Sequence, residues 1–464
     1  MNKPREHWGT KLGLVLATAG SAVGLGSLWQ FPYVTGQNGG GVFVLLYLFF
    51  SLLVGIPVFI AEVLLGRRAQ RGPVGAFEDL SHHSPNWRMA GWLSVGASFL
   101  ILSFYSVVAG WGMNYVLLGL NSFTNGKTPD QIRNVFDTLY QSGDIQVLWH
   151  FLFMALNIGV VIGGVRKGIE HWNKILMPVL FLMLIGLLGY TCTLDGFGDA
   201  LRFIFFPDFS RLSPNGVLSA MGLAFFTLSV GLGILLTYGS YMRPEDDVPK
   251  TAVQVALMTT VASLIAALVI FPIIFSFGFA PEGGPGLVFK TLPVLFAQLP
   301  GSMILSTVFF VLVVFTALTS SISLLEAIVA NSIEIYDWSR RKAVLLCGLG
   351  AFVVGIPSAL SGSGGMFTSW TSMYGRDFFS TINFVASNWL LPLGGLFITI
   401  FAGWFLDPCI LKSEFVKGSR WAWLYGPWRF ILRWVAPVAI ILVMLDQAGV
   451  INFNALFQHE SAPR

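Results

Sequence analysis

Two copies of one tetrapeptide lie in the middle of long apolar segments of this 464-residue sequence. They are Val23-Gly24-Leu25-Gly26 and Val230-Gly231-Leu232-Gly233, and a serine precedes each closely, at Ser21 and Ser229. Paired glycines weaken a helix, and an interrupted helix leaves backbone N–H and C=O groups free. Free N–H groups attract anions and free carbonyls attract cations. The alternative interpretation is close helix packing through small residues.

A second group of polar residues consists of hydroxyls within the apolar segment 302–330. Sodium binds oxygen ligands, and neutral hydroxyls and carbonyls can hold it without burying a fixed charge in a membrane. The alternative is that each hydroxyl bonds back to a carbonyl of its own helix. The cluster comprises Thr316, Thr319, Ser320, Ser321 and Ser323.

The elements that must position these residues are membrane helices. Hydrophobic residues make up 55% of the chain, charged residues only 11%, and the mean hydropathy is +0.73, which is a membrane composition. Apolar segments of about 20 residues recur along the chain, too long for strands, so we predict eleven transmembrane helices in an all-α fold. The predicted spans are Leu12–Tyr33, Gly39–Gly66, Met89–Gly119, Val147–Gly164, Ile175–Thr193, Asn215–Tyr241, Thr251–Ala280, Ser302–Ala330, Ala343–Ser361, Phe378–Phe405 and Trp428–Leu445.

Charge placement predicts the orientation. Most Lys and Arg residues fall in loops on the side of the N-terminus, so we expect that terminus in the cytoplasm of a bacterium and the chain in its inner membrane. The net charge of +4 then reflects topology, and no nucleic-acid partner is expected beside the membrane lipid. Three scattered cysteines indicate neither a disulfide framework nor a metal site, and the sequence has no nucleophile and base set typical of an enzyme.

The two tetrapeptides lie five spans apart, which predicts an internal repeat. An odd number of spans makes the second copy enter the membrane from the opposite face, so the copies are inverted. We expect a single transporter-like domain with a first repeat at 1–193, a second at 215–405 and a peripheral span at 428–445. Helices 1 and 6 would be broken at the midplane.

Several longer motifs resemble the neurotransmitter:sodium symporters, and the similarity extends over nearly the whole chain. The number of spans resembles the bacterial amino-acid members. The motifs are Arg5-Glu6-His7-Trp8-Gly9-Thr10-Lys11-Leu12-Gly13, Phe31-Pro32-Tyr33, Gly39-Gly40-Gly41, Tyr105-Ser106-Val107-Val108-Ala109-Gly110-Trp111, Phe225-Phe226-Thr227-Leu228-Ser229, Ile270-Phe271-Pro272, Leu318-Thr319-Ser320-Ser321 and Leu390-Leu391-Pro392-Leu393-Gly394-Gly395.

The resemblance implies a binding site for an amino acid. Its carboxylate would meet the amides of Leu25 and Gly26 and the Tyr105 hydroxyl, and its ammonium group would face carbonyls at the two breaks. An apolar pocket would favour hydrophobic side chains, because a buried unpaired charge is costly. The ammonium group would contact Ala22, Phe226, Thr227 and Ser229, the pocket would comprise Ile101, Phe226, Leu232 and Leu324, and Ser320 would also line the site.

The resemblance further implies two sodium sites. Sodium site 2 would use carbonyls of Gly20, Val23 and Thr316 and hydroxyls of Thr319 and Ser320, all suitable residues. Sodium site 1 would comprise Ala22, Ser27, Thr227 and Thr259, where Ser27 and Thr259 replace the larger amide or acid ligands common in the family.

Chloride use is left open by the sequence. The family usually balances the first sodium with chloride or a carboxylate, but the usual glutamine position is Leu223 here. Either this sodium and the chloride are both lost, or hydroxyls of Tyr47, Thr227 and Ser263 hold the anion.

Two gates are also implied. The outer gate would pair Gln30 with Asn383, both neutral where the family commonly has charges. The inner gate would pair Arg5 with Glu334, and Trp8 and Tyr241 would lie close to them.

We therefore expect a sodium-coupled symporter that imports neutral hydrophobic amino acids by alternating access, as a monomer or weak dimer. The alternatives are a non-transporting amino-acid sensor on the same fold and an ion channel. The channel is disfavoured because no segment resembles a selectivity filter.

Overall fold

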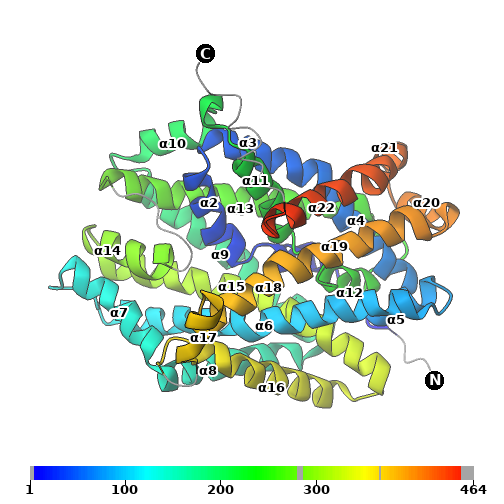
Figure 1. Cartoon of the computed structure of the whole chain (residues 1–464), viewed down its shortest axis with the longest axis horizontal. Helices are drawn as coiled ribbons and strands as arrows, with labels where there is room; N and C mark the ends of the chain where they lie inside the picture. The colour runs from blue at the N-terminus through cyan, green and yellow to red at the C-terminus, as the bar shows by residue number, and fades with distance from the viewer. Residues whose placement is uncertain (1–4, 279–285, 365–366, 451–464) are drawn as a thin grey trace.

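The computed structural model describes residues 5–278, 286–364 and 367–450, and within these ranges the chain is helical without any strand. The long helices run side by side along one direction (Figure 1). The short helices α7 (Pro129–Gln141) and α14 (Leu292–Ala297) lie at one end of this bundle, and α5 (Pro73–Leu80) and α20 (Pro408–Val416) lie at the other (Figure 1). The two ends therefore correspond to the two faces of a membrane.

Nine helical segments of the described ranges are long and apolar enough to cross a membrane, and one bent pair adds a tenth. The predicted all-helical membrane fold is confirmed. The sixth predicted span, Asn215–Tyr241, is not among these ten, because it is divided between two helices that are each too short to cross alone. Residues 279 and 280 of the seventh predicted span lie outside the described residues. The nine segments are Gly41–Ala69, Pro85–Leu120, Gly143–Val161, Val165–Thr191, Val248–Ser276, Ser302–Tyr336, Arg340–Ala359, Phe378–Phe405 and Ala422–Gln447.

Several of these segments contain a π-helical turn, so they consist of more than one element. The elements are α3 (Gly41–Phe50), η2 (Ser51–Gly55), α4 (Ile56–Ala69), α6 (Pro85–Leu120), α8 (Gly143–Val161), η3 (Val165–Glu170), α9 (His171–Thr191), α13 (Val248–Ser276), α15 (Ser302–Tyr336), α16 (Arg340–Ala359), α18 (Phe378–Val385), η6 (Ala386–Leu390), α19 (Leu391–Ile400), η7 (Phe401–Phe405), η8 (Ala422–Leu424), α21 (Tyr425–Phe430), η9 (Ile431–Val435) and α22 (Ala436–Gln447). Shorter elements outside them include α10 (Phe197–Phe205), η4 (Phe209–Arg211), η5 (Leu287–Thr291) and α17 (Thr368–Tyr374).

The first predicted span is interrupted at the first tetrapeptide. Helix α1 (Lys11–Ala22) starts at Thr10, whose hydroxyl accepts from the Gly13 amide, and stops at Val23, whose backbone is not helical. The chain resumes as η1 (Gly26–Gln30) and α2 (Phe31–Gln37), and the two halves are bent by 57°.

The second tetrapeptide separates α11 (Pro214–Thr227) from α12 (Ile234–Ser240). Both of its glycines have positive φ values, 89° at Gly231 and 72° at Gly233, which residues with a Cβ rarely adopt. The Gly231 amide donates to a carboxylate oxygen of Glu62 at 2.9 Å, so this buried acid holds the interrupted segment. Both predicted helix breaks are thus present.

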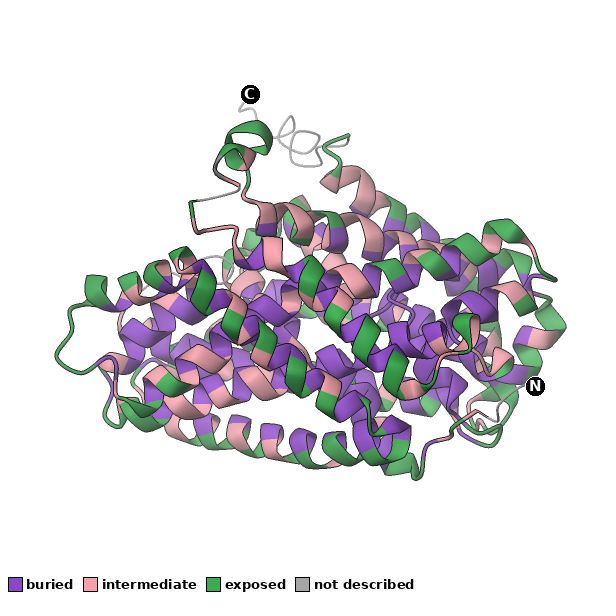
Figure 2. Ribbon diagram, turned by 90° about the horizontal axis from the view of Figure 1, so that it is seen from below, coloured by how far each residue is buried: buried purple, intermediate pink, exposed green. Residues whose placement is uncertain are grey.

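The broken helices lie inside the bundle. Helix α1 packs against α9, α13 and α15, and α12 packs against α4 and α15. Buried residues concentrate in the centre of the bundle, whereas the outward faces of the outer helices are exposed (Figure 2). Many of these exposed residues are large and apolar, as expected for contact with lipid; examples are Leu182, Ile185, Leu349, Val353, Trp434 and Val438.

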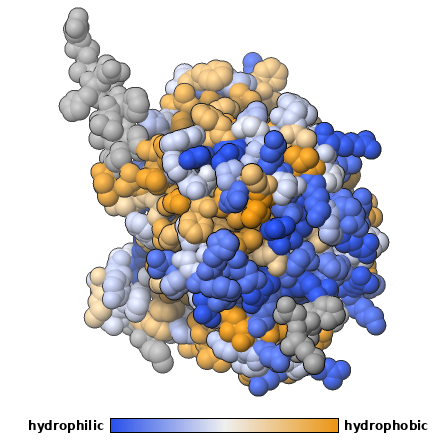
Figure 3. All heavy atoms as spheres, turned by 90° about the vertical axis from the view of Figure 1, so that its right-hand side faces the viewer, coloured by the Kyte–Doolittle hydropathy of each residue, from blue (hydrophilic) through white to orange (hydrophobic). Residues whose placement is uncertain are grey.

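Hydrophilic side chains gather on the end of the bundle that carries α5 and α20 (Figure 3). This end includes Arg68, in the last turn of α4, and Arg71, which follows shortly after that helix. A basic membrane face is the one that normally lies in the cytoplasm.

Candidate substrate and ion site at the helix breaks

The two helix breaks meet at a small cavity of about 60 Å³. All eleven residues that we predict for substrate binding line it, although they come from α1, η1, α6, α11 and α15 and from the breaks themselves. The structure therefore brings together Ala22, Leu25, Gly26, Ile101, Tyr105, Phe226, Thr227, Ser229, Leu232, Ser320 and Leu324.

Five further residues line the same cavity. Gly24 and Ser21 belong to the first break and could have been found from their place beside the tetrapeptide. Ile234 directly follows the second tetrapeptide and could have been found in the same way. Phe104 and Leu391 carry no comparable sequence signal, because only helix packing brings them to the cavity. The five are Ser21, Gly24, Phe104, Ile234 and Leu391.

Polar groups of the cavity lie at the first break. The Leu25 amide donates to the Tyr105 hydroxyl at 3.3 Å, and the Ser229 hydroxyl donates to the Ser21 carbonyl at 3.0 Å. The start of η1 directs helix N–H groups and the positive end of the helix dipole toward this region, which suits a carboxylate. The Ser21–Ser229 bond also joins the two breaks.

The other side of the cavity is apolar. Ile101, Leu232 and Leu324 are buried, and the Phe226 ring lies against Gly26, where an added Cβ would come within 2.6 Å of the ring. The described residues lining the cavity include no charged side chain. This lining can accept an apolar group and offers no partner to a charged one.

Four predicted ligands of sodium site 2 lie together where α1 ends against α15. The Ser320 hydroxyl donates to the Gly20 carbonyl at 3.2 Å, and the Thr319 hydroxyl donates to the Thr316 carbonyl at 3.1 Å. An added Cβ at Gly20 would lie 3.2 Å from Thr319 Cβ, so the two helices are in close contact. Val23, the fifth predicted ligand, is buried at the break itself.

The residues predicted for sodium site 1 differ in their hydrogen bonding. The Ala22 carbonyl accepts the Gly24 amide at 2.9 Å, and the Thr259 hydroxyl donates to the carbonyl one turn earlier in α13. In contrast, the Ser27 hydroxyl is buried and has no hydrogen-bond partner among the described residues.

The predicted chloride residues do lie together. The Tyr47 hydroxyl and the Thr227 hydroxyl are 3.0 Å apart, and the Ser263 hydroxyl faces Tyr47. Ser51 and Thr260 also face Tyr47 and were missed by the sequence analysis. Within the described ranges, the buried hydroxyls of Ser51 and Ser263 have no hydrogen-bond partner. Unsatisfied hydroxyls can donate to an anion or accept a cation, so the residues fit a small ion.

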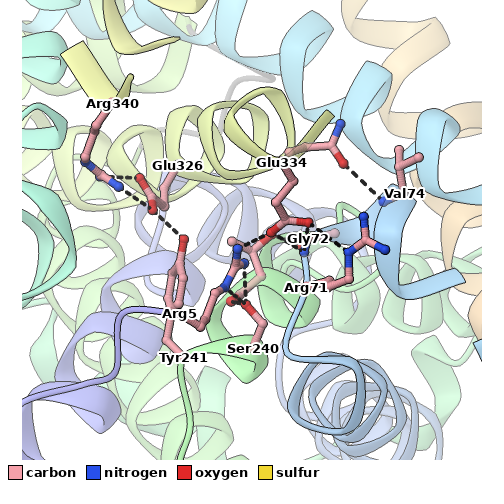
Figure 4. A network of polar contacts seen from close by, with 12 residues as sticks. Arg5, Arg71, Gly72, Val74, Ser240, Tyr241, Glu326, Glu334 and Arg340 are labelled. Atoms are coloured by element: carbon pink, nitrogen blue, oxygen red, sulfur yellow. Dashed lines mark hydrogen bonds and ion pairs between the residues drawn. The ribbon is translucent and has the colours of Figure 1, made fainter. Parts of the chain in front are cut away.

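The predicted inner gate is a network of ion pairs and hydrogen bonds at the basic end of the bundle (Figure 4). The Arg5 guanidinium pairs with Glu334 and donates to the Ser240 hydroxyl. Its centre lies 4.6 Å from the centroid of the Tyr241 ring. The Trp8 indole donates to the Tyr238 carbonyl at 3.1 Å. The N-terminal segment is therefore fastened to α12 and α15.

A second part of this network was not predicted. The Tyr241 hydroxyl donates to Glu326 at 2.6 Å, and Arg340 donates to the same carboxylate at 2.6 Å (Figure 4). Glu326 thus ties helix α15 to α16 and to the end of α12.

The predicted outer gate would pair Gln30 with Asn383 across the bundle. No hydrogen bond joins Gln30 to Asn383 among the described residues, and Asn383 instead accepts from the Ser387 hydroxyl at 3.1 Å. Gln30 lines a cavity of about 190 Å³ that shares Phe226 and Leu391 with the substrate cavity. The polar residues around Gln30 in that cavity are Ser219, Ser387, Asn388, Asp446 and Gln447.

Comparison with known proteins agrees with this geometry. The model of the sodium:neurotransmitter symporter family matches residues 5–138 and 130–445. A sodium-dependent transporter of Bacillus subtilis (strain 168), YhdH, is 39% identical over 96% of this chain and 98% of its own length. The human sodium- and chloride-dependent GABA transporter 2 is 27% identical over 92% of this chain and 74% of its own length.

A solved structure is similar over nearly the same extent. The crystal structure of MhsT in complex with L-phenylalanine matches with a TM-score of 0.86 and 43% sequence identity, over 96% of this chain and 100% of that one. The fold, the helix breaks and the family model lead to one conclusion: the chain is a multi-pass membrane transporter, not an enzyme, and belongs to the sodium:neurotransmitter symporter family as one of its bacterial members.

Proposed function

We propose that this transporter imports neutral hydrophobic amino acids together with sodium. The observation that carries the proposal is the cavity at the two helix breaks, which combines helix N–H groups, carbonyls and hydroxyls on one side with an uncharged apolar lining on the other. A zwitterion needs partners for both of its charged groups, whereas a side chain such as that of leucine or phenylalanine needs only apolar contacts. The phenylalanine named for the MhsT complex fits this chemistry.

The positions of the two proposed gates support alternating access. The Arg5 network separates the cavity from the basic end of the bundle, and the Gln30 cavity adjoins it from the other side, with Phe226 between the two. Release toward the cytoplasm then requires the Arg5 network to open. The inverted repeats predicted at 1–193 and 215–405 would move relative to each other in this step. The inner-membrane location with a cytoplasmic N-terminus is part of the same proposal.

We propose that sodium binding at site 2 drives transport, because carbonyl and hydroxyl groups from two different helices meet there. Ser27, Ser51 and Ser263 support a second ion position. Each is a buried hydroxyl without a protein partner in the described part of the chain, and unsatisfied buried polar groups are rare. These hydroxyls favour the alternative in which a first sodium and a chloride are both retained.

Uptake into proteoliposomes tests the proposal. We expect a sodium gradient to drive accumulation of leucine and phenylalanine, and Thr319→Ala combined with Ser320→Ala to abolish the sodium dependence. Replacing chloride with gluconate should reduce uptake if the second ion position holds an anion.

Two results would contradict the proposal. Binding of amino acids without any uptake would identify a sensor, and preferential uptake of glutamate or lysine over leucine would show that the pocket is assigned wrongly.

A further inference from the structure

Asn173 is a buried polar residue of α9 that the transport proposal does not use. Its side chain is 0% exposed. The amide nitrogen donates to the Ile169 carbonyl at 2.9 Å, which fixes which end of the amide is the oxygen. Within the described part of the chain this oxygen, Oδ1, accepts no hydrogen bond. A buried polar atom without a partner is costly, so its position calls for an explanation.

The Asn173 oxygen lies beside sodium site 2. A Cβ atom added to Gly20 would be 2.2 Å from Oδ1 and 3.2 Å from Thr319 Cβ. Gly20 and Thr319 are both predicted ligands of that site, and they come from α1 and α15. Helix α9 packs against both of these helices, so Asn173 reaches the site from a third direction.

The neighbourhood of Oδ1 is rich in oxygen acceptors and poor in free donors. The Thr319 hydroxyl already donates to the Thr316 carbonyl, and the Ser320 hydroxyl donates to carbonyls at Gly20 and Ser21. No charged side chain is needed to hold sodium in such a place, because amide, hydroxyl and carbonyl oxygens all bind hard cations. A cation would satisfy Oδ1 and its neighbours at once.

We propose that Asn173 Oδ1 is a sodium ligand that completes site 2 from the α9 side. The inference rests on the proposed function, since it needs sodium to bind at Gly20, Thr319 and Ser320. Helix α9 enters the bundle from the basic end, where η3 and the N-terminal segment meet. Asn173 therefore binds the ion on the side from which it leaves toward the cytoplasm, and it sets the sodium affinity of the site.

Asn157 of α8 provides a matched control. It is also 0% exposed, and its amide nitrogen also donates to the carbonyl four residues earlier, at 3.0 Å. Its oxygen, however, accepts from the Ser321 hydroxyl at 2.6 Å. The two asparagines thus differ in whether the amide oxygen has a protein partner.

The test measures thermal stabilisation of the purified full-length protein by sodium without substrate. Asn173→Leu keeps the size of the side chain and removes the oxygen, so the sodium concentration for half-maximal stabilisation should rise about tenfold. Asn173→Asp places a carboxylate at the same point, where protons compete with sodium. Its sodium affinity should therefore fall as the pH is lowered from 8 to 5, a dependence that a packing role would not create. Asn157→Leu should lower the melting temperature without shifting the sodium midpoint.

Each outcome decides the question. Unchanged sodium midpoints in Asn173→Leu, with no new pH dependence in Asn173→Asp, would make Asn173 a packing residue. If Asn173→Leu does not fold, the pH dependence of Asn173→Asp decides alone. If sodium does not stabilise the wild-type protein at all, the proposed function is refuted instead. Loss of sodium stabilisation in the Thr319→Ala and Ser320→Ala double variant verifies that the assay measures site 2.

Discussion

Replacing Arg5 with alanine should open the cytoplasmic side of the transporter. Arg5 contributes an ion pair to Glu334, hydrogen bonds to Ser240 and a cation–π contact with Tyr241, and its side chain is only 16% exposed. Glu334 does not lose all partners in this variant, because the Gly72 amide and Arg71 still contact it. The variant therefore loses the charge-assisted contacts of Arg5 but leaves no carboxylate without a partner. We expect this to destabilise the closed state by about 2–3 kcal/mol.

This energy corresponds to a shift of about 30- to 150-fold in the balance between closed and open forms. The shift can be read from the labelling rate of a cysteine at Thr237, a fully buried position of α12. The background should lack Cys192, Cys347 and Cys409. In inverted membrane vesicles an impermeant thiol reagent should label the Thr237→Cys protein at least tenfold faster once Arg5→Ala is added.

Arg71→Ala is the matched control. Arg71 also contacts Glu334, at 3.7 Å, but it pairs mainly with Asp79 at 2.8 Å and does not fasten the N-terminal segment. The Arg71→Ala variant should label within about twofold of the wild-type rate, since exposed ion pairs contribute little to stability. Equal rates in the Arg5→Ala and wild-type backgrounds would show that this network does not close the pathway.

Two further predictions concern the cavity and the opposite face of the bundle. Gly26→Ala would bring a Cβ atom within 2.6 Å of the Phe226 ring. We therefore expect the substrate Kd in a binding assay to rise at least about tenfold, while the stabilisation by sodium persists. An unchanged Kd would mean that the ring moves aside freely. Burial of the Tyr140 hydroxyl and its hydrogen bond to Asp377 at 2.5 Å raise the pKa of Tyr140, so the protonated form is favoured by folding and its contribution to stability should be lost as the pH rises above about 10. The difference in melting temperature between wild type and Tyr140→Phe should accordingly shrink between pH 8 and 11, and a constant difference would contradict this explanation.

Local patterns were enough to predict several parts of the fold. Long apolar segments require membrane helices, because only a helix satisfies its own backbone groups in lipid. The paired glycines of each tetrapeptide predict the breaks, and the structure has positive φ values at Gly231 and Gly233. The hydroxyl run around Thr319 predicts a polar strip on an apolar helix, and this strip faces the end of α1.

Tertiary structure decided which residues from distant helices meet. The sequence places Gln30 and Asn383 in two apolar spans, but it does not show that Gln30 ends the π-helical turn η1 or that Asn383 lies three residues before the π-helical turn η6. No hydrogen bond joins the two side chains among the described residues. Leu391 reaches the substrate cavity and Thr260 reaches Tyr47 only through packing.

Asn173 shows most clearly which properties the sequence predicts and which depend on packing. Its type and its place in an apolar helix show only that a polar group is buried there, and a bond to its own helix would explain that fully. The structure shows that the nitrogen makes this bond while the oxygen points to Gly20. The helical periodicity of one segment can be predicted from its sequence, whereas the rotation of one helix relative to another depends on side-chain packing across the whole bundle.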